Sequence, residues 1–472
     1  MSLPPQPPHG ASSDSPRHGC GVVGIFSEKG DLIPQKLFYG LFALQHRGQE
    51  SAGIAYRKGD ELVVFKDLGM VSTVLRKYLE GRRTSTVGIG HVRYSTLGGN
   101  EIENAQPVHA SCNKGEVAVA HNGNISNAKA INNELVAEGS IFQSSSDTEL
   151  MLHLIARSRA PDFESALKET LNRLEGAYSI AMIHDNALVA ARDPLGFRPL
   201  YVGTSDGLTV VASETCAFDI LKIADRRQVE PGELIIVDES GLRSERFAES
   251  KRRAQCVFEL IYFARPDSEV FTESVHRMRK KMGAALASDD PISVDIAVPV
   301  PDSGNIAAMG YAEAAGIPLE FGLTRNHYTG RSFILPTSAE RELAVRMKLH
   351  PVRSAIEGKR VVLIDDSLVR GTTASILVRL VREAGALEVH LRLSSPELKW
   401  PCYFGIDIPT REELISNSLS PEEIASQIGA DSVRFLSIDL LKQTVETPNE
   451  YCFACFNGRY PIAVGPDAGI CK

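Results

Sequence analysis

The stretch that most constrains the fold is "KRVVLIDDSLVRGTTASILVRLVREAG", residues 359–385. Its "VVLI" segment is an apolar, β-branched run that predicts a buried strand. A polar, glycine-containing loop follows, and then a helical pattern that ends at Gly385, a typical residue after a helix. Helical and strand-like runs also alternate earlier, where "VHRMRKKMGAALA" precedes "DIAVPVPDSG". This alternation predicts a parallel sheet covered by helices.

The same stretch carries candidate chemistry at the carboxyl end of its strand. Asp365 and Asp366 stand at the edge where open parallel sheets bind their ligands. An acid pair there suits ribose hydroxyls or Mg²⁺, and the N–H groups at the start of the following helix suit an anionic phosphate. The alternative is a generic acidic loop, but an acid pair combined with "RGTT" is a more specific pattern.

The amino-terminal half has a different pattern. Residues 20–240 contain many short apolar runs broken by Gly, Asn and Asp, with a few helical segments between them, which predicts sheets flanked by helices. A charged stretch at 241–255 predicts a domain boundary. The expected class is α/β together with α+β. The expected organisation is a leader at 1–19, a first domain at 20–250, a second domain at 251–450 and a cysteine-containing tail at 451–472.

Cys20 opens the first apolar run, after a leader of nineteen residues that contains five prolines. If the leader is removed, Cys20 carries an α-amine with a reference pKa of about 8 beside a thiol of about 8.5. The amine can then serve as general base for the thiol of its own residue. On the local residues alone, a small buried cysteine at the start of an edge strand is the plainer interpretation.

Three further segments offer groups for such a site. Arg93, after an apolar strand, can grip a carboxylate with its two-pronged guanidinium, or be a surface cation. Asn122 and Gly123 are first a hairpin-turn signal, but their N–H groups also suit an oxyanion hole. Asp147 precedes a helical pattern, where an N-cap is the simplest role.

Taken together, "CGVVGIF", "LQHRGQESAG", "GHVRYST", "AHNGNISN" and "SSDTEL" resemble the glutamine domain of the N-terminal-nucleophile (class II) amidotransferases. The resemblance implies an αββα sandwich in which the thiolate of Cys20 attacks the side-chain amide of glutamine and releases ammonia. It implies that Arg93 holds the α-carboxylate of glutamine and Asp147 its α-amino group. Asn122 and Gly123 would form the oxyanion hole.

The segment around Asp365 is similar to the phosphoribosyl pyrophosphate loop of the phosphoribosyltransferases. "VPVPDSGNIA" and "RNHYTGRSFILP" resemble that family's diphosphate loop and mobile loop. The resemblance implies that phosphoribosyl pyrophosphate is bound by Asp302, Ser303, Gly304, Arg331, Lys348, Asp365, Asp366, Arg370, Gly371, Thr372 and Thr373. It implies Mg²⁺ at Ser303, Asp365 and Asp366.

The two domains in this order resemble the glutamine phosphoribosyl pyrophosphate amidotransferases. In that family ammonia from glutamine attacks C1 of the ribose as diphosphate leaves. The product, 5-phosphoribosylamine, is the first intermediate of de novo purine synthesis. The resemblance further implies a homotetramer and feedback inhibition by purine nucleotides.

Four of the eight cysteines fall in related segments. Cys452 and Cys455 form a CxxC pair that alone suits half a zinc site, half an iron–sulfur site or a redox pair. Cys256 and Cys402 are the upstream candidates to complete it, and four thiolates suit Zn²⁺ or a [4Fe–4S] cluster. "CVFELIYFARPDS", "WPCYFGIDIPTREEL" and "YCFACFNGRYP" resemble the iron–sulfur subtype of this amidotransferase family. That subtype implies a [4Fe–4S] cluster on all four, and a cleaved leader.

Composition excludes several other classes. A net charge of −8 argues against nucleic-acid binding through a broad basic field. No apolar run approaches the roughly 18 residues of a membrane helix. The leader lacks the apolar core of a secretory signal, so a reducing, cytoplasmic location is expected.

Two other functions remain open from the sequence. One is a catalytically silent regulatory protein that binds phosphoribosyl pyrophosphate or purine nucleotides. The other is a different class II amidotransferase, such as an asparagine or glucosamine phosphate synthase. The segment "VVLIDDSLVRGTT" disfavours the second, because those enzymes have other acceptor domains.

Overall fold

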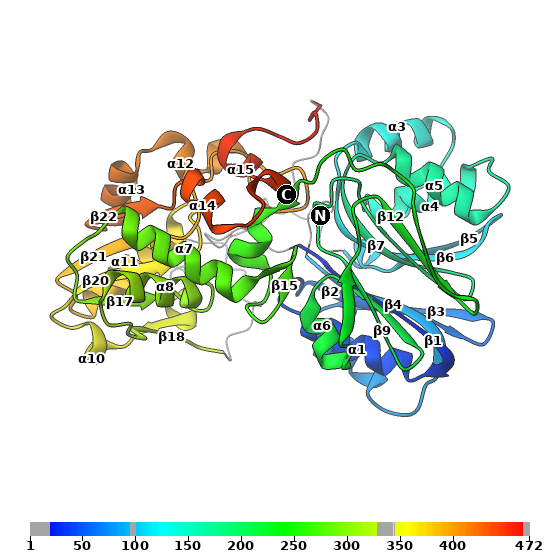
Figure 1. Ribbon diagram of the computed structural model, residues 1–472, viewed down its shortest axis with the longest axis horizontal. Helices are drawn as coiled ribbons and strands as arrows, with labels where there is room; N and C mark the ends of the chain where they lie inside the picture. Colours follow the sequence, from blue (N-terminus) through cyan, green and yellow to red (C-terminus); the bar gives the residue numbers. More distant parts are fainter. Residues whose placement is uncertain (1–18, 95–100, 328–342, 344, 466–472) are drawn as a thin grey trace, which may run out of the picture. The chain divides into compact units, whose positions relative to one another are not determined.

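The computed structural model describes residues 19–94, 101–327, 343 and 345–465 (Figure 1). The chain divides into two compact units. Of the described residues, the first unit holds 19–275, 401–409 and 447–465, and the second holds the rest. The units meet in sequence at Val275 and His276, later than the charged stretch at 241–255 suggested.

Charge did not mark the boundary because the charged stretch continues a sheet of the first unit. Residues 241–246 pair with the apolar strand before them, and their polar side chains belong to a sheet edge. The cysteine-containing tail was expected to be a separate segment. Its described part belongs instead to the first unit.

Two antiparallel sheets form the centre of the first unit. The seven-stranded sheet has the order β11-β9-β10-β1-β4-β2-β3, and the six-stranded sheet has the order β13-β12-β8-β7-β6-β5. The strands of the first sheet are β1 (Gly21–Asp31), β2 (Ser51–Lys58), β3 (Glu61–Leu68), β4 (Ser85–Arg93), β9 (Tyr201–Ser205), β10 (Leu208–Ala212) and β11 (Asp225–Gln228). Those of the second are β5 (Val108–Cys112), β6 (Gly115–Ile125), β7 (Gly176–His184), β8 (Ala187–Arg192), β12 (Glu233–Asp238) and β13 (Gly241–Arg246).

The sheets pack face to face, and helices cover their outer faces. In β1, Val22 and Phe26 belong to the apolar layer between the sheets, whereas Val23 and Ile25 face the helices. Gly24 allows the close approach, because a Cβ there would lie 2.7 Å from Leu188 of the other sheet. The helices of this unit are α1 (Ile33–Ala43), α2 (Val71–Val74), α3 (Ala128–Ala137), α4 (Thr148–Arg157), α5 (Phe163–Arg173), α6 (Thr215–Leu221) and α15 (Ala454–Asn457).

The expected αββα sandwich is therefore present. Side chains of α1 and α6 share a core with the seven-stranded sheet, and those of α3, α4 and α5 share one with the six-stranded sheet. Short elements complete the unit. They are η1 (Arg76–Tyr78), η2 (Ile102–Asn104), β14 (Gln255–Cys256), the π-helical turn η3 (Glu259–Phe263), β15 (Glu269–Val270), β16 (Glu273–Ser274), η5 (Pro448–Glu450) and β23 (Tyr451–Cys452).

A four-stranded parallel sheet of order β17-β20-β21-β22 forms the centre of the second unit, as expected. Its strands are β17 (Ile296–Pro299), β20 (Arg360–Asp365), β21 (Glu388–Leu393) and β22 (Ser432–Phe435); β18 (Leu323–Arg325) and β19 (Leu349–Pro351) form a separate pair. Its helical elements include α7 (Val275–Asp289), which begins at the unit boundary, α8 (Asn305–Ala315), α10 (Arg353–Ile356), α11 (Thr372–Glu383), α12 (Ile415–Ser418), α13 (Pro421–Ile428), α14 (Ile438–Thr444) and η4 (Arg411–Glu413).

Helices α7 and α8 approach each other unusually closely. A Cβ on Gly283 would lie 1.8 Å from the carbonyl oxygen of Ala307, and one on Gly310 would lie 1.9 Å from that of Lys280. Two glycines therefore permit backbone-to-backbone packing at this crossing. On the other side, α11 and α13 share an apolar core with alternate residues of the sheet.

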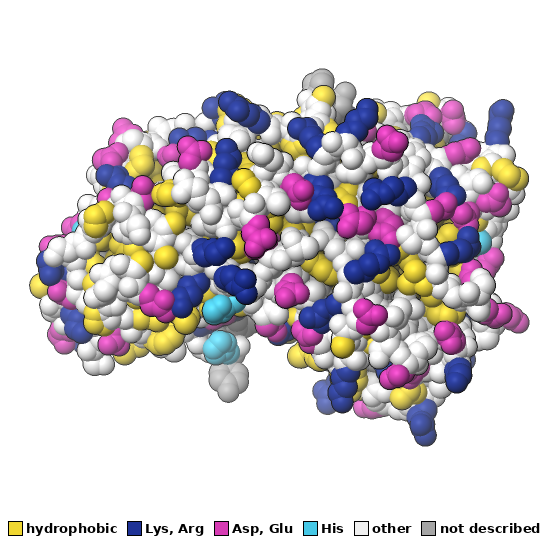
Figure 2. Space-filling model, viewed as in Figure 1, with side chains coloured by type: hydrophobic (Ala, Val, Ile, Leu, Met, Phe, Trp, Pro, Cys, Tyr) yellow, Lys and Arg dark blue, Asp and Glu magenta, His cyan; other side chains and the backbone are white. Residues whose placement is uncertain are grey.

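The surface is mixed in charge. On the face shown in Figure 2, basic and acidic side chains are interspersed. Within the described ranges, no helix has both the length and the apolar character needed to cross a bilayer.

Candidate active sites

Cys20 lies immediately before β1 and is 6% exposed. Its Sγ lies 3.5 Å from the carbonyl oxygen of Tyr94, just past the end of β4. Burial raises the pKa of the Cys20 thiol, while the charges of Arg93 and Arg198 act to lower it. An uncharged thiol is therefore the resting state, and a base is needed to form the thiolate.

Arg93 and Asp147, the expected glutamine-binding pair, both act electrostatically on this thiol. Arg93 ends β4 and is 3% exposed. Asp147 precedes α4, but its carboxylate makes no cap; instead it accepts a hydrogen bond from the N–H of Ile125 at 3.0 Å. Burial acts to raise the pKa of Asp147, but the nearby His121 and the hydrogen bonds from Ile125 and Thr148 lower the pKa overall. The simple N-cap interpretation is therefore wrong, and the carboxylate is held charged.

Asn122 and Gly123 do not form a hairpin turn. Strand β6 continues through both residues, which pair with Ser179 and Tyr178 of β7. A Cβ on Gly123 would lie 2.0 Å from the carbonyl oxygen of Ala177, so this position requires glycine. The side chain of Asn122 is fully buried, and its Nδ2 and Oδ1 have no hydrogen-bond partner among the described residues. A preformed, unused donor is what an oxyanion hole requires.

A buried ionic network contacts the backbone of the candidate nucleophile Cys20. Arg47 donates from Nε to the carbonyl oxygen of Cys20 at 2.9 Å. Its other nitrogens bind Glu259 at 2.7 and 2.9 Å and Glu214 at 2.5 Å. Arg198 binds the same Glu259 at 2.9 Å. All four side chains of this network are fully buried.

Sequence reasoning missed this network. Arg47 stands within the motif "LQHRGQESAG", but nothing local distinguishes it from a surface cation. Glu259 and Arg198 lie far away in sequence, and only the fold brings the three together. Charged residues next to apolar runs, as in "CVFELIYF" and "PLGFRPL", were the available signal.

The acid pair of the second unit lies at the edge predicted for it. Strands β17 and β20 run parallel with Pro299 beside Ile364, so the loops that follow both strands emerge together. Ser303 donates from Oγ to Asp365 Oδ1 at 3.3 Å. Gly304 is required here, because a Cβ would lie 2.1 Å from the carbonyl oxygen of Ile364.

Burial makes this acid pair costly without a cation. Burial and the charge of Asp366 raise the pKa of Asp365 well above its ordinary value. Burial also raises the pKa of Asp366, whose Oδ1 is buried without a hydrogen-bond partner in the described structure. A divalent cation would offset the repulsion between the two carboxylates, so this donor set fits Mg²⁺.

Helix α11 begins at Thr372, directly after this loop. Gly371 has a φ of 80° and makes the tight turn into the helix, and no side chain caps the first turn. The N–H groups of Thr372 and Thr373 therefore stand at a helix N-terminus, which favours an anionic phosphate.

The other residues expected to bind phosphoribosyl pyrophosphate have no described contact with the acid pair. Arg370 is ion-paired with Glu413, with Nε 3.2 Å from Oε2. Asp302 is ion-paired with Arg325. Lys348 is exposed and directly precedes β19. Arg331 lies outside the described residues.

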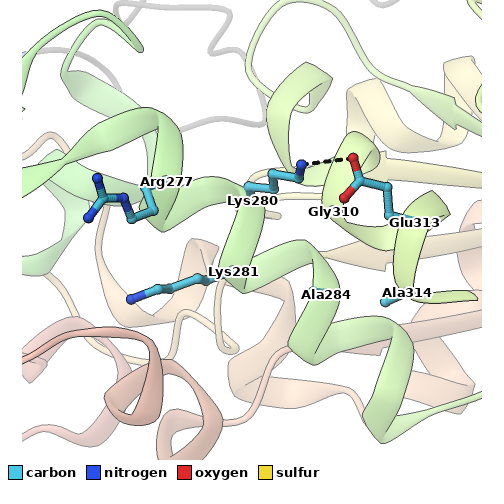
Figure 3. Close-up of a pocket in the computed structure, with 7 residues that line it drawn as sticks. All are labelled: Arg277, Lys280, Lys281, Ala284, Gly310, Glu313 and Ala314. Atoms are coloured by element: carbon cyan, nitrogen blue, oxygen red, sulfur yellow. Dashed lines mark ion pairs between the residues drawn. The ribbon is translucent and has the colours of Figure 1, made fainter.

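A surface pocket of about 420 Å³ lies elsewhere in this unit, between α7 and α8 (Figure 3). Its basic residues Arg277, Lys280 and Lys281 lie on α7, and Lys280 is ion-paired with Glu313 of α8 at 2.7 Å. None of the expected phosphoribosyl residues lines it.

The four cysteines expected to bind a cluster gather within the first unit. Cys256 and Cys452 are direct partners in the parallel pair β14-β23. They line one small apolar cavity together with Cys402 and Cys455. Phe197, Phe404 and Tyr460 form part of the same lining.

The chemistry of this donor set fits a cluster. Burial raises the pKa of Cys256 to about 12, and it raises those of Cys452 and Cys455 as well. Such thiols stay protonated until a metal replaces the proton. In the described part of the chain, no three potential ligands are arranged around a single metal ion. In a [4Fe–4S] cluster each thiolate binds a different iron, so four separated sulfurs around a cavity are compatible with it.

Comparison with known proteins bears on both units. Residues 91–219 match the glutamine amidotransferase domain family. Amidophosphoribosyltransferase of Bacillus subtilis is 46% identical over 454 residues, covering 95% of each chain. The chloroplastic amidophosphoribosyltransferase 1 of Arabidopsis thaliana is 47% identical over 453 residues, covering 95% of this chain and 80% of the relative.

Solved structures agree. One, described as the allosteric regulatory enzyme of purine biosynthesis, superposes with a TM-score of 0.90 at 45% identity, covering 96% of this chain and 98% of the other. The B. subtilis glutamine phosphoribosylpyrophosphate amidotransferase, complexed with ADP and GMP, gives 0.89 at 45% identity, covering 96% and 99%. These full-length matches decide against an asparagine or glucosamine phosphate synthase. The chain belongs to the amidophosphoribosyltransferase family.

Proposed function

We infer that the chain converts glutamine, 5-phosphoribosyl pyrophosphate and water to 5-phosphoribosylamine, diphosphate and glutamate, the first step of de novo purine synthesis. Family membership supports this reaction. The observation that carries it is that one chain holds candidate residues for both half-reactions. Cys20 has Arg93 and Asp147 in electrostatic range, and the Asp365–Asp366 pair stands at the carboxyl edge of the parallel sheet.

In the glutaminase half, the α-amine of processed Cys20 would take the thiol proton. The thiolate then attacks the side-chain carbon of glutamine, while the Nδ2 of Asn122 donates to the developing oxyanion. Ammonia leaves with a proton from the amine, and water releases glutamate from the thioester. Arg93 and Asp147 hold the two charges of the substrate backbone. Removal of residues 1–19 is part of this proposal, since the amine exists only after cleavage.

In the phosphoribosyl half, the residues around the acid pair hold the second substrate. Asp365 and Asp366 would bind ribose hydroxyls and, with Ser303, Mg²⁺. The N–H groups at Thr372 and Thr373 would hold the 5-phosphate. Bound Mg²⁺ would neutralise charge on the departing diphosphate. The chain's own contribution is to position C1 of the ribose for ammonia.

We further propose that Cys256, Cys402, Cys452 and Cys455 bind a [4Fe–4S] cluster with a structural role. It would tie together three segments of the first unit that are distant in sequence. The convergence of the four thiols on one apolar cavity supports this assignment. Iron and acid-labile sulfide at four each per chain would support it, whereas stoichiometric zinc with neither would contradict it.

Purine nucleotides are proposed as feedback inhibitors, a homotetramer as the assembly and the cytoplasm as the location. The B. subtilis relative solved with ADP and GMP supports the nucleotide part. Inhibition by nucleoside monophosphates and a light-scattering mass four times that of the chain are the expected results.

The reaction is tested by glutamine hydrolysis with anaerobically purified protein, with and without phosphoribosyl pyrophosphate and Mg²⁺. Strong stimulation, with diphosphate released alongside glutamate, is expected. A Cys20→Ala variant should lose the use of glutamine and keep the use of ammonia, which a silent regulatory protein would not show. No activity from a chain whose intact mass begins at Cys20 would refute the proposal.

A further inference from the structure

Arg198 projects from an unusually well-fixed turn after β8. The carboxylate of Asp193 accepts a hydrogen bond from the N–H of Phe197 at 3.1 Å. Arg192 donates to the carbonyl oxygens of Gly196 at 2.7 Å and Arg198 at 2.8 Å. Backbone held from both sides in this way fixes where the Arg198 side chain begins.

The guanidinium of Arg198 is fully buried and only partly paired. Nη1 donates to Glu259 at 2.9 Å, but Nε and Nη2 are buried with no hydrogen-bond partner among the described residues. A buried charged donor left without a partner is costly, and natural proteins seldom keep one without a reason. Glu259, Cys256 and Cys402 act on the charge of Arg198, but none of them hydrogen-bonds Nε or Nη2.

The open side of this guanidinium faces the bond that processing would cut. A Cβ built on Gly19 would lie 3.5 Å from Nη2 of Arg198, and one on Gly405 would lie 2.9 Å from the same atom. Glycine at 405 lets that segment lie directly against the cation, whereas a Cβ at Gly19 would only be in ordinary van der Waals contact with it. The charge of Arg198 also reaches the thiol of Cys20.

We propose that Arg198 is a positioning residue of the glutaminase site, placed to keep the new α-amine of Cys20 uncharged so that it can accept the thiol proton. This inference rests on the proposed processing at Cys20. Hydrolysis of the Gly19–Cys20 peptide bond leaves the amine beside the guanidinium. A second positive charge there is disfavoured, whereas the thiolate formed by proton transfer is favoured.

The other charged groups around Cys20 have other roles or partners. Arg93 and Asp147 act on the thiol with opposite signs, and both are assigned to the charges of the substrate. Arg47 contacts the carbonyl oxygen of Cys20, but its charge is shared by two buried carboxylates. Arg198 has one carboxylate partner among the described residues, and the thiols of Cys256 and Cys402 also act on its charge. Neither thiol hydrogen-bonds Nη2, the guanidinium nitrogen that lies beside Gly19.

The test is the pH profile of kcat/KM for glutamine hydrolysis by full-length enzyme that has been processed. Wild type, Arg198→Met and Arg198→Lys are compared, with intact mass confirming that each begins at Cys20 and with equal iron content. Arg57→Met is the matched control. Arg57 is also buried and multiply bonded, but it lies near the far end of β2 from Ser51, the residue that pairs with Arg93.

A unit charge about 5 Å away, at an effective dielectric constant of about 20–40, shifts an amine by about one to two pH units. The acid limb is the part of the pH profile where kcat/KM falls as the amine becomes protonated. In wild type its midpoint should therefore lie at about pH 7 or below, whereas a free α-amine has a pKa of about 8. Arg198→Met should move the limb up by about one unit or more and lose about tenfold at pH 7. Arg198→Lys and Arg57→Met should keep the wild-type limb.

Several outcomes would overturn the inference. A wild-type limb at pH 8 or above does so without any variant, which keeps the test decisive if Arg198→Met fails to fold. A shift shared equally by Arg198→Lys and Arg198→Met, or an unshifted Arg198→Met, does so as well. Absence of glutamine hydrolysis by processed wild type at every pH would instead overturn the proposed function, and this inference with it.

Discussion

Replacing Glu259 with Gln should strongly destabilise the first unit. The carboxylate makes three short bonds, two to Arg47 at 2.7 and 2.9 Å and one to Arg198 at 2.9 Å. All three side chains are fully buried. In Glu259→Gln, the two buried guanidinium groups share one remaining carboxylate, that of Glu214. Glu214 is bonded to Arg47 but not to Arg198.

Removing one partner of a buried ion pair costs about 3–5 kcal/mol, because the other charge stays buried without compensation. For a unit of this size, 1 kcal/mol corresponds to about 2–4 °C in Tm, so a fall of roughly 6–20 °C is expected. The carbonyl oxygen of Cys20 also loses its support, since Arg47 is no longer held in place. Glutamine-dependent activity should fall more than ammonia-dependent activity.

The assay is urea and thermal unfolding followed by circular dichroism, with both activities measured on the same samples. Glu116→Gln is the matched control, because it removes a carboxylate that pairs with a buried arginine, Arg57, but is itself 40% exposed. Its loss should be about 0.2–1 kcal/mol. If Glu259→Gln unfolds within that same range, the idea that the network holds the nucleophile in place is wrong.

Asp147→Asn should raise the KM for glutamine by about 10–100-fold, the worth of a charge-assisted hydrogen bond, and leave ammonia-dependent kcat unchanged; steady-state kinetics with each nitrogen donor decides. Gly310→Ala should lower the free energy of unfolding by about 1–3 kcal/mol in denaturant titration, because the new Cβ meets a carbonyl oxygen of α7 at 1.9 Å. Burial opposes ionisation of Glu214, yet His46 and Arg47 lower its pKa far below the ordinary 4.5. Since unfolded Glu214 binds a proton first, stability should fall as pH drops below about 4.5, and Glu214→Gln should flatten this slope in unfolding measured from pH 6 to 3. Cys452→Ser should abolish the broad visible absorption of an iron–sulfur centre; unchanged iron and sulfide in the variant would contradict the assignment.

The sequence was most informative where periodicity and turn chemistry agree. The strand, acidic loop and helix of residues 359–385 appear as β20, a turn at Gly371 and α11. The αββα sandwich was inferred from the family resemblance, because short apolar runs predict strands but not the order in which the strands pair. The boundary near residue 250 failed because the charged stretch there continues a sheet as β13.

Local rules misled at two places in the candidate site. Asn-Gly usually turns a hairpin, but the preceding strand continues through Asn122 into its pairing with β7, and tertiary pairing overrides the local preference. Asp147 looks like an N-cap, but its carboxylate is bound by Ile125 instead. Arg198 could not be found, because its role depends on segments that meet only in the folded chain.

The parallel pair of β14 and β23 has a consequence for the order of biosynthesis. Strand β23, with Cys452, and the nearby Cys455 emerge from the ribosome only after the whole of the second unit has been made. A chain that stops early therefore exposes the edge of β14 and leaves Cys256 without its neighbour. This pair can therefore close only after the second unit has been synthesised.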